Sequence, residues 1–205
     1  MVILGLTGSI GMGKSTAAAD FRRFRVAVHD ADETVHALMA PGGAAFDQIC
    51  QFFPGVRTKI GIDRKRLGDL VFADMAALKK LENILHPLIR KQKTEFLKRS
   101  SLRKQKLVVL DVPLLFETGG DAKCDAVVVV TAPAFVQRAR VMARPGMTAE
   151  KFESILAKQV PDVTKRRFAD FVVQTGLGRL ESLRKIRHIA HTALSLKPNK
   201  WPINA

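Results

Sequence analysis

Five short apolar segments recur along the chain, and each is followed by polar or turn-forming residues. These segments are residues 2–6, 26–28, 107–110, 126–130 and 171–173. Compact runs of this kind are typical of parallel strands that are buried on both faces. Segments with helical spacing lie between them, the first at residues 14–23. The alternation predicts an α/β fold, in which helices flank a doubly wound, five-stranded parallel sheet.

Two segments do not fit this simple alternation of strand and helix. Residues 33–104 lie between the second and third predicted strands and include helical patterns at 64–72 and 75–99. We expect a helical insertion here that is large enough to form a subdomain. Residues 140–166 carry several basic side chains, and we expect a mobile helical excursion. The remaining residues, 1–32, 105–139 and 167–205, would form the core of the fold.

The composition is typical of a globular protein. The chain has 205 residues, of which 47% are apolar, enough for a substantial core. No apolar run approaches the ~20 residues of a membrane helix, so no membrane partner is expected. Cys50 and Cys124 lie far apart without a disulfide or metal motif, and the N-terminus lacks signal-peptide features. We therefore expect a cytoplasmic protein that is a monomer or a weak homo-oligomer.

The formal net charge is +15, and Lys and Arg cluster at residues 90–106 and 138–144. Such a charge favours a polyanionic partner, either nucleic acid or a nucleotide substrate, although a solvated basic surface is an ordinary alternative. The chain has no tyrosine, and its single tryptophan, Trp201, lies in the tail. Because few side chains are available to stack on bases, we expect no nucleic-acid partner.

The most specific motif follows the first predicted strand. The run Gly8-Ser9-Ile10-Gly11-Met12-Gly13-Lys14-Ser15 matches G-x-x-x-x-G-K-[ST] in full, with a strand before it and a helix after it. Glycines let successive N–H groups turn toward phosphate oxygens, and the helix N-terminus adds partial positive charge. Lys14 should reach the β- and γ-phosphates, and Ser15 should offer its hydroxyl to Mg²⁺. The residues predicted to bind ATP in this loop are Gly11, Met12, Gly13, Lys14, Ser15 and Thr16.

Carboxylates follow the second and third predicted strands. Ligands of an open parallel sheet bind beyond the carboxyl ends of its strands, so Asp30, Asp32 and Asp111 should lie on the edge that holds the phosphates. In extended backbone, Asp30 and Asp32 would point the same way. One could then accept the proton of an attacking hydroxyl, and the other could join the Mg²⁺ shell; a helix cap is the alternative for Asp32. Asp111 is placed like a Walker B aspartate that coordinates Mg²⁺, or it simply ends a strand.

With these residues in place, the chain resembles the dephospho-CoA kinase family over residues 2–195. The motifs that carry the resemblance are Gly5-Leu6-Thr7-Gly8-Ser9-Ile10-Gly11, Asp30-Ala31-Asp32, Leu67-Gly68-Asp69-Leu70-Val71-Phe72, Leu81-Glu82-Asn83-Ile84-Leu85-His86-Pro87-Leu88-Ile89-Arg90, Asp111-Val112-Pro113-Leu114-Leu115-Phe116-Glu117, the spacing of Gln137, Arg140 and Arg144, and Ala169-Asp170-Phe171-Val172. The His-Pro-x-Ile-Arg and Pro-Leu-Leu-Phe-Glu elements make the resemblance specific, since a P-loop alone is generic.

The resemblance implies a P-loop kinase fold and ATP-dependent phosphorylation of the ribose 3′-hydroxyl of dephospho-coenzyme A, the last step of coenzyme A synthesis. It implies that residues 33–104 hold the substrate, that residues 140–166 form a lid, and that the loop at 174–176 lines the adenine. The implied catalytic residues are Asp32 as general base, Lys14 and Arg140. Arg144 joins the ATP-binding set, and the implied substrate-binding residues are Asp32, His86, Arg90, Leu115 and Glu117.

Residue chemistry leaves several of these roles open. His86 precedes Pro87 within a helical pattern. Its side chain could contact a ligand, or it could be packed in the protein with one ring nitrogen hydrogen-bonded. Arg90 lies one turn further along the same helical face. Arg140 and Arg144 are four residues apart and could present two guanidinium forks together, or they could belong to a solvated basic face.

Three positions depart from the family pattern. Arg25 stands where glycine is usual, before the second strand, and it is strained if that turn needs positive φ. Lys158 replaces a common arginine and lacks the fork. Gln174 replaces a common Asp or Asn, which weakens residue-level expectations for the adenine loop.

Two other kinds of protein compete with this interpretation. A shikimate-type or nucleoside monophosphate kinase also pairs a P-loop with an acidic loop, although the long insertion and His86-Pro87 argue against the shikimate type. The other competitor is a nucleic-acid-binding ATPase or regulator, in which the net charge of +15 would attract the nucleic-acid backbone. A GTPase is not favoured, because the chain has no Asn-Lys-x-Asp motif.

Overall fold

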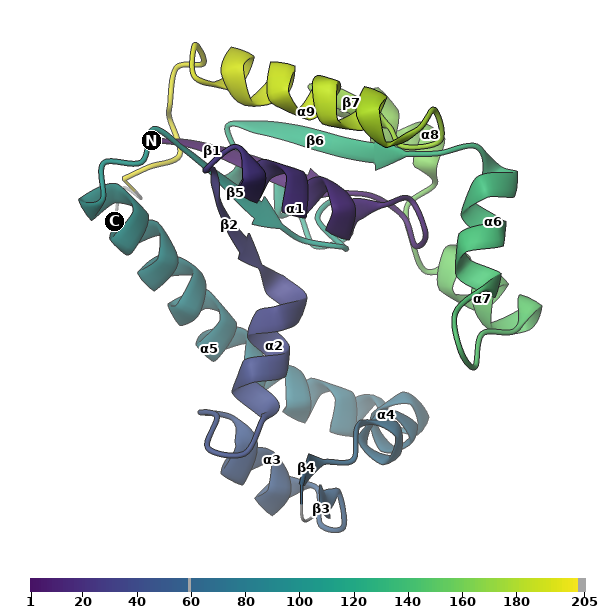
Figure 1. Cartoon of the computed structure of the whole chain (residues 1–205). Helices are drawn as coiled ribbons and strands as arrows, with labels where there is room; N and C mark the ends of the chain where they lie inside the picture. The colour runs from purple at the N-terminus through teal and green to yellow at the C-terminus, as the bar shows by residue number, and fades with distance from the viewer. Residues whose placement is uncertain (59, 203–205) are drawn as a thin grey trace. The chain divides into compact units, whose positions relative to one another are not determined.

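The computed structural model describes residues 1–58 and 60–202, and the chain divides into two compact units (Figure 1). The first unit comprises Met1–Asp30 and Arg99–Ala205, and the second comprises Ala31–Lys98. Each unit has its own hydrophobic core. In the part of the chain that the structure describes, no helix combines the length and apolar character that crossing a membrane requires.

The first unit contains a five-stranded parallel sheet, which confirms the predicted fold class. Its strands are β1 (Val2–Thr7), β2 (Ala27–Asp30), β5 (Leu107–Asp111), β6 (Ala126–Thr131) and β7 (Phe171–Gln174). They are arranged in the order β2-β5-β1-β6-β7, and every neighbouring pair is parallel. All five carboxyl ends therefore lie at one edge of the sheet.

Helices α1 (Lys14–Arg23) and α9 (Arg179–Ala193) pack on the same face of this sheet (Figure 1). The core between them and the sheet contains alternate residues of β1 and β6 together with Ala17 and Phe21 of α1 and Ile186 and Ile189 of α9. Because Ala17 and Phe21 are four residues apart, they share one face of α1. This packing fixes the first turn of α1 next to the carboxyl edge of the sheet.

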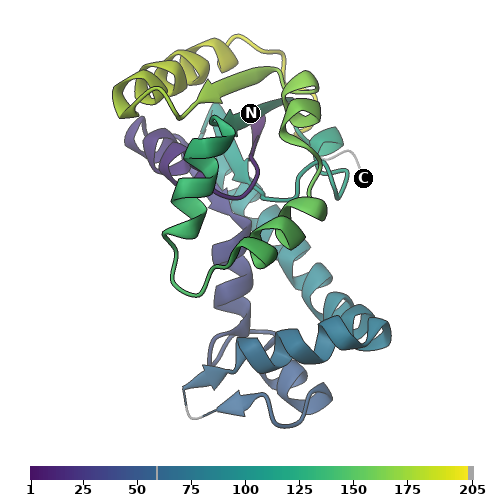
Figure 2. The ribbon, with the colours of Figure 1, turned by 90° about the vertical axis from the view of Figure 1, so that its right-hand side faces the viewer.

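A helical segment connects β6 to β7 and lies toward the viewer in Figure 2. It contains α6 (Ala134–Met142), α7 (Ala149–Ala157) and α8 (Asp162–Arg167), and the Thr148 side chain caps α7 by accepting from the Lys151 N–H. This segment was expected to be a mobile excursion that carries basic side chains, but Lys165 within it is completely buried. The first unit also contains the short 3₁₀ helix η1 (Asp121–Lys123).

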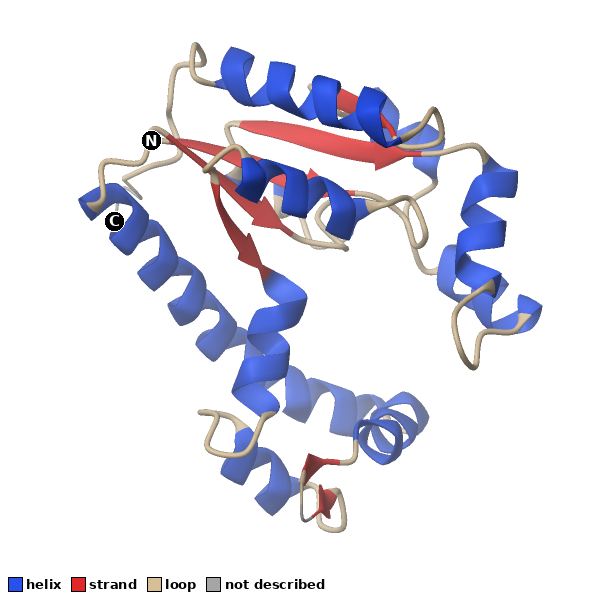
Figure 3. Ribbon diagram, in the orientation of Figure 1, coloured by secondary structure: helices blue, strands red, loops and turns tan. Residues whose placement is uncertain are grey.

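The second unit is helical except for one short hairpin (Figure 3). It contains α2 (Ala31–Met39), α3 (Phe46–Phe52), β3 (Arg57–Thr58), β4 (Gly61–Ile62), α4 (Arg64–Ala73) and most of α5 (Met75–Leu102). The antiparallel hairpin of β3 and β4 was not predicted. Asp63 caps α4 by accepting from the Arg66 N–H, and α5 continues through Pro87.

Candidate active site

The glycine-rich loop after β1 has the backbone conformation that phosphate binding requires. Gly11 and Gly13 have φ values of 77° and 90°, in the left-handed region that side chains rarely adopt. The Met12 N–H donates to the Ser9 carbonyl and closes the turn. Gly13 is the N-cap of α1, so the partial positive charge of the helix N-terminus is directed at the loop. Ser15 and Thr16, in the first turn of α1, are exposed.

Lys14 forms an ion pair with Asp111, the last residue of β5. Its Nζ lies 2.7 Å from Oδ1 of Asp111, whose side chain is completely buried. Asp111 is aligned with Leu6 of β1 on one side and with Asp30 of β2 on the other. The prediction that Asp30 and Asp111 lie at the same sheet edge is therefore confirmed, and the edge is the one that carries the phosphate loop.

The extended loop expected around Asp32 is not observed. Strand β2 ends at Asp30 and α2 begins at Ala31, so Asp32 lies in the first turn of a helix. The prediction that Asp30 and Asp32 point the same way in extended backbone is wrong, because no extended residue separates them. The Asp32 side chain is exposed, and a carboxylate in the first turn is favoured by the helix dipole. Its role as general base stays a prediction.

Thr175, in the loop after β7, connects the phosphate loop to α6. Its hydroxyl donates to the Met12 carbonyl at 2.8 Å and accepts from Nη1 of Arg140 at 2.9 Å. Arg140 also donates through Nη2 to the Thr175 carbonyl at 2.8 Å. The sequence indicated this loop only as a lining of the adenine, and the contact with Met12 was not predicted.

Arg140 and Arg144 do not share a helical face. Helix α6 ends at Met142, and Arg144 lies beyond it in an exposed turn. The i, i+4 helical spacing behind the expected pair of guanidinium forks does not hold, because the helix ends between the two arginines, and the paired role of the forks stays a prediction. Arg140 is held by Thr175, whereas Arg144 extends from a segment without regular structure.

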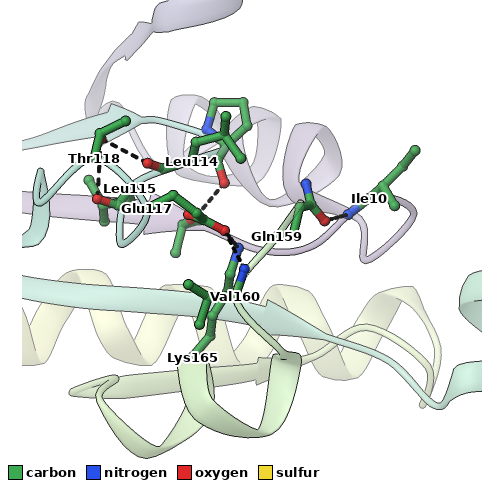
Figure 4. Close-up of polar contacts among 10 residues, drawn as sticks. Ile10, Leu114, Leu115, Glu117, Thr118, Gln159, Val160 and Lys165 are labelled. Carbon is green, nitrogen blue, oxygen red and sulfur yellow. Dashed lines mark hydrogen bonds and ion pairs between the residues drawn. The ribbon is translucent and has the colours of Figure 1, made fainter. Parts of the chain in front are cut away.

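Two glutamines bind both backbone groups of Ile10 in the phosphate loop. Nε2 of the buried Gln137 donates to the Ile10 carbonyl at 2.7 Å. The Ile10 N–H donates to Oε1 of Gln159 at 3.1 Å (Figure 4). Gln137 was noted only as part of a family motif, and nothing in the local sequence signalled Gln159. Together they connect the phosphate loop to the start and the end of the segment between β6 and β7.

Glu117 joins the loop after β5 to the same segment (Figure 4). Its Oε1 accepts from the Val160 N–H at 2.8 Å and lies 2.8 Å from Nζ of Lys165. Burial raises the pKa of Glu117, but the Lys165 ammonium and the backbone N–H groups of Glu117 and Val160 outweigh it. The pKa therefore lies below its ordinary value of 4.5. Lys165 is the partner that the sequence did not reveal.

The remaining predicted substrate-binding residues differ in their exposure: one is buried and two are exposed. The Leu115 side chain is buried, in a position where it packs against Gly5 of β1. His86 and Arg90 lie one turn apart on α5 in the second unit, and both are exposed. The alternative that His86 is a packed residue is therefore wrong. Its substrate contact, like that of Arg90, stays a prediction.

The donor atoms at the sheet edge fit a magnesium ion that is bound together with nucleotide phosphates. Among the residues that the structure describes, no group of three or more His, Cys, Asp or Glu side chains could hold a metal alone. Mg²⁺ in kinases takes only one or two protein oxygens beside phosphates and water. The buried Asp111 carboxylate and the exposed Ser15 hydroxyl offer these oxygens next to the phosphate loop.

A phosphate loop, its lysine and a strand-ending aspartate on a parallel sheet define a P-loop nucleotide-binding protein. A family model described as dephospho-CoA kinase matches residues 2–178. A dephospho-CoA kinase from Rhodospirillum rubrum is 57% identical, covering 91% of this chain and 89% of its own length. Another from Paramagnetospirillum magneticum is 60% identical, covering 81% and 78%. The chain therefore belongs to the dephospho-CoA kinase family, as the resemblance indicated.

Solved structures agree with this assignment. A crystal structure of a Thermus thermophilus protein superposes with a TM-score of 0.83 at 34% identity and covers 95% of this chain and 98% of its own. A dephospho-CoA kinase from Campylobacter jejuni gives a TM-score of 0.64 at 26% identity, with 92% and 95% covered. The fold of the whole chain is thus that of a P-loop kinase.

Proposed function

We propose that the chain transfers the γ-phosphoryl group of ATP to the ribose 3′-hydroxyl of dephospho-coenzyme A, the final step of coenzyme A biosynthesis. The observation that carries the proposal is the intact phosphate loop, with Lys14 paired to the buried Asp111, in a chain that matches this family over residues 2–178. The cytoplasmic location expected from the sequence is consistent with this activity and stays a prediction.

The transfer is in line. The 3′-oxygen forms a bond to the γ-phosphorus while the bond from that phosphorus to the β,γ-bridging oxygen breaks, and ADP leaves. The loop N–H groups and Lys14 stabilise the negative charge on the β- and γ-phosphates. Asp32 takes the proton of the attacking hydroxyl. Ser15 and Asp111 would hold Mg²⁺, which supplies positive charge to the phosphates when it is bound.

Residues 140–166 serve as the lid in this proposal. The anchored end of the segment supports this role, because Gln159 and Val160 contact Ile10 and Glu117. The exposed turn that carries Arg144 is the part we expect to close over ATP, while Arg140 approaches the transferred group from its position on Thr175. Closure would exclude water and limit futile hydrolysis of ATP.

The second unit, with His86 and Arg90, holds dephospho-coenzyme A in this proposal. The exposed imidazole and guanidinium, one helical turn apart, are suited to the phosphate and ribose oxygens of the substrate. Glu117, which is committed to Lys165 and Val160, would act on the substrate through the lid segment, and Leu115 would shape the site from the core.

The base assignment is tested with Asp32→Asn and with Glu33→Gln as its matched control. Both residues are exposed acids in the first turn of α2, so each substitution removes a similar helix-dipole interaction. We expect Asp32→Asn to retain ATP binding and to lower kcat by about 10²–10⁴-fold, whereas Glu33→Gln should retain most of the activity. Nearly intact turnover by Asp32→Asn would show that Asp32 only stabilises the helix start.

The substrate assignment is tested by ADP release with a panel of acceptors. The purified chain, with ATP and Mg²⁺, is given dephospho-coenzyme A, shikimate or a nucleoside monophosphate. We expect stimulation by dephospho-coenzyme A alone, with phosphorylation at the 3′-oxygen verified by mass and NMR spectroscopy. Stimulation by shikimate or a nucleoside monophosphate, but not by dephospho-coenzyme A, would overturn the proposal.

A further inference from the structure

A cavity lies within the first unit, away from the phosphate loop. Its volume is about 700 Å³. Three segments line it: residues 24–26 between α1 and β2, residues 105–107 leading into β5, and the part of α9 between Arg184 and Leu194. We call it the α9 cavity. Its volume is within the range of small-molecule sites, which is roughly 300–1,000 Å³.

The α9 cavity is separate from the ATP site. Helix α1 begins at Lys14 in the phosphate loop and ends next to the cavity, and its ten residues span about 15 Å at 1.5 Å per residue. Likewise, β5 begins with Leu107 at the cavity and ends with Asp111 at the phosphate edge. The two sites therefore lie at opposite edges of the sheet, and one molecule of ATP cannot occupy both.

The lining of the α9 cavity carries only positive fixed charge. Arg25, Lys106, Arg184 and Arg187 contribute four cations, and no carboxylate is among the lining residues. Within the described residues, no ion pair joins any of these four cations to an Asp or Glu side chain. Four unneutralised cations around a concave surface concentrate anions there.

Apart from the amide of Gln105, the rest of the lining is apolar or aromatic. Phe24, Val26, Leu107, Ala190 and Leu194 contribute carbon surface. His188 and His191, three residues apart on α9, add two imidazole rings. An inorganic anion would leave this surface without a partner, whereas a ligand with a ring system beside its phosphates would cover it. The combination favours an organic polyphosphate over phosphate alone.

Arg25 reaches this cavity from a backbone position that is unfavourable for arginine. Its φ is 61°, at the end of α1, where glycine is the usual residue. The other non-glycine residue with positive φ in the described chain is Lys104, which also lies between a helix and a strand, two residues before Lys106. Both strained positions are thus occupied by basic residues at the same edge of the sheet.

We propose that the α9 cavity binds a small organic polyphosphate of the nucleoside triphosphate class. Arg25, Lys106, Arg184 and Arg187 bind its phosphates, and its ring system lies against Phe24 and the histidines of α9. This site is additional to the ATP site and does not depend on the identity of the phosphoryl acceptor. A cavity of this volume suits one such molecule better than an extended nucleic acid.

The first test counts binding sites by isothermal titration with the β,γ-imido analogue of ATP. We expect two sites per chain in the unsubstituted protein and one in the Arg184→Gln/Arg187→Gln variant, whose kcat with saturating substrates should be unchanged. The matched control, Lys185→Gln/Lys197→Gln, removes two exposed lysines that do not line the cavity and should retain two sites. A single site in the unsubstituted protein would overturn the proposal, as would equal loss in the control.

The second test isolates the α9 cavity by removing Lys14. In a Lys14→Ala background that is folded by circular dichroism, we expect one site to remain. Adding Arg184→Gln/Arg187→Gln should weaken it about 10-fold or more, because hydrogen bonds to charged groups are lost. Inorganic tripolyphosphate and a short single-stranded RNA serve as separate probes. If tripolyphosphate binds as tightly as the imido analogue, the proposal that the ligand is organic is overturned. If RNA binds more tightly than the imido analogue, the surface is a nucleic-acid site instead.

Discussion

Arg25 and Lys104 are the two non-glycine residues in the described chain with a left-handed backbone, with φ values of 61° and 55°. A side chain in this conformation places Cβ close to the carbonyl oxygen, at a cost of about 1–2 kcal/mol relative to a right-handed residue. Glycine avoids this contact. At residue 25, arginine lowers the stability of the fold but places a guanidinium in the α9 cavity. A substitution that relieves the strain should therefore also weaken ligand binding.

Arg25→Gly is therefore expected to raise the free energy of unfolding by about 1 kcal/mol, since the Cβ contact is removed. It should also weaken binding of the imido analogue at the α9 cavity. Urea denaturation with an unchanged m-value measures the first effect, and titration measures the second. Lys104→Gly is the control, because Lys104 does not line the cavity: it should gain stability and keep the binding. A destabilised Arg25→Gly protein would contradict this explanation.

Thr175 is the residue through which Met12 and Arg140 are connected. We expect Thr175→Val, which keeps the shape and removes the hydroxyl, to raise the KM for ATP about 10-fold, because each lost hydrogen bond is worth about 1 kcal/mol. Initial-rate kinetics at saturating dephospho-coenzyme A measures this change. Thr175→Ser retains the hydroxyl and should restore the KM. An unchanged KM in Thr175→Val would show that the phosphate loop holds its position without this contact.

At the scale of elements, the ion pair between Glu117 and Lys165 fixes α8 to the loop after β5. Lys165 is completely buried and the Glu117 side chain is 13% exposed, so either partner alone would be a poorly solvated charge. We expect Lys165→Met and Glu117→Gln each to lower the free energy of unfolding by about 3 kcal/mol. The double variant should lose much less than the sum, because no buried charge remains. Additive losses in a double-mutant cycle would contradict this pairing.

The same pair predicts how stability depends on pH. The folded-state pKa of Glu117 is below 4.5, so its ionised form stabilises the folded state above that pH, and this contribution is lost as pH falls through the lowered pKa. Denaturation curves on either side of pH 4.5 should therefore show a shallower acid decline for Glu117→Gln than for the unsubstituted protein. Parallel declines would show that other carboxylates control the acid transition.

The strands and helices around the sheet could be predicted from local sequence far better than the side-chain contacts between these elements. Helix α1 begins and ends where its pattern predicted, because its apolar face and the preceding glycines are local signals. Asp32 was expected in extended backbone or as a helix cap, and the local sequence did not show that α2 starts one residue earlier, directly after β2. The burial of Lys165 could not be predicted, because its partner Glu117 is distant in sequence and burial of a charge depends on tertiary pairing. The two-residue strands of the hairpin are too short to give an alternating pattern.

At the scale of the whole molecule, a net charge of +15 meets two substrates that are both polyanions. Long-range attraction of this kind accelerates encounter and is screened over about 10 Å at 0.1 M salt, whereas contacts within a closed site are screened much less. The charge should therefore act on substrate capture more than on the chemical step. If the basic surface were only solvated and did not attract substrates, salt would have no greater effect on substrate capture than on the chemical step.

As ionic strength rises, kcat/KM for both ATP and dephospho-coenzyme A should fall, while kcat at saturating substrates changes little, because screening weakens encounter but not the closed complex. Initial rates over a series of salt concentrations, repeated with a second salt to exclude ion-specific effects, measure the two parameters. Equal decline of kcat and kcat/KM would show that salt disturbs the site itself. ATP hydrolysis that required added RNA would instead make nucleic acid the partner that the charge serves.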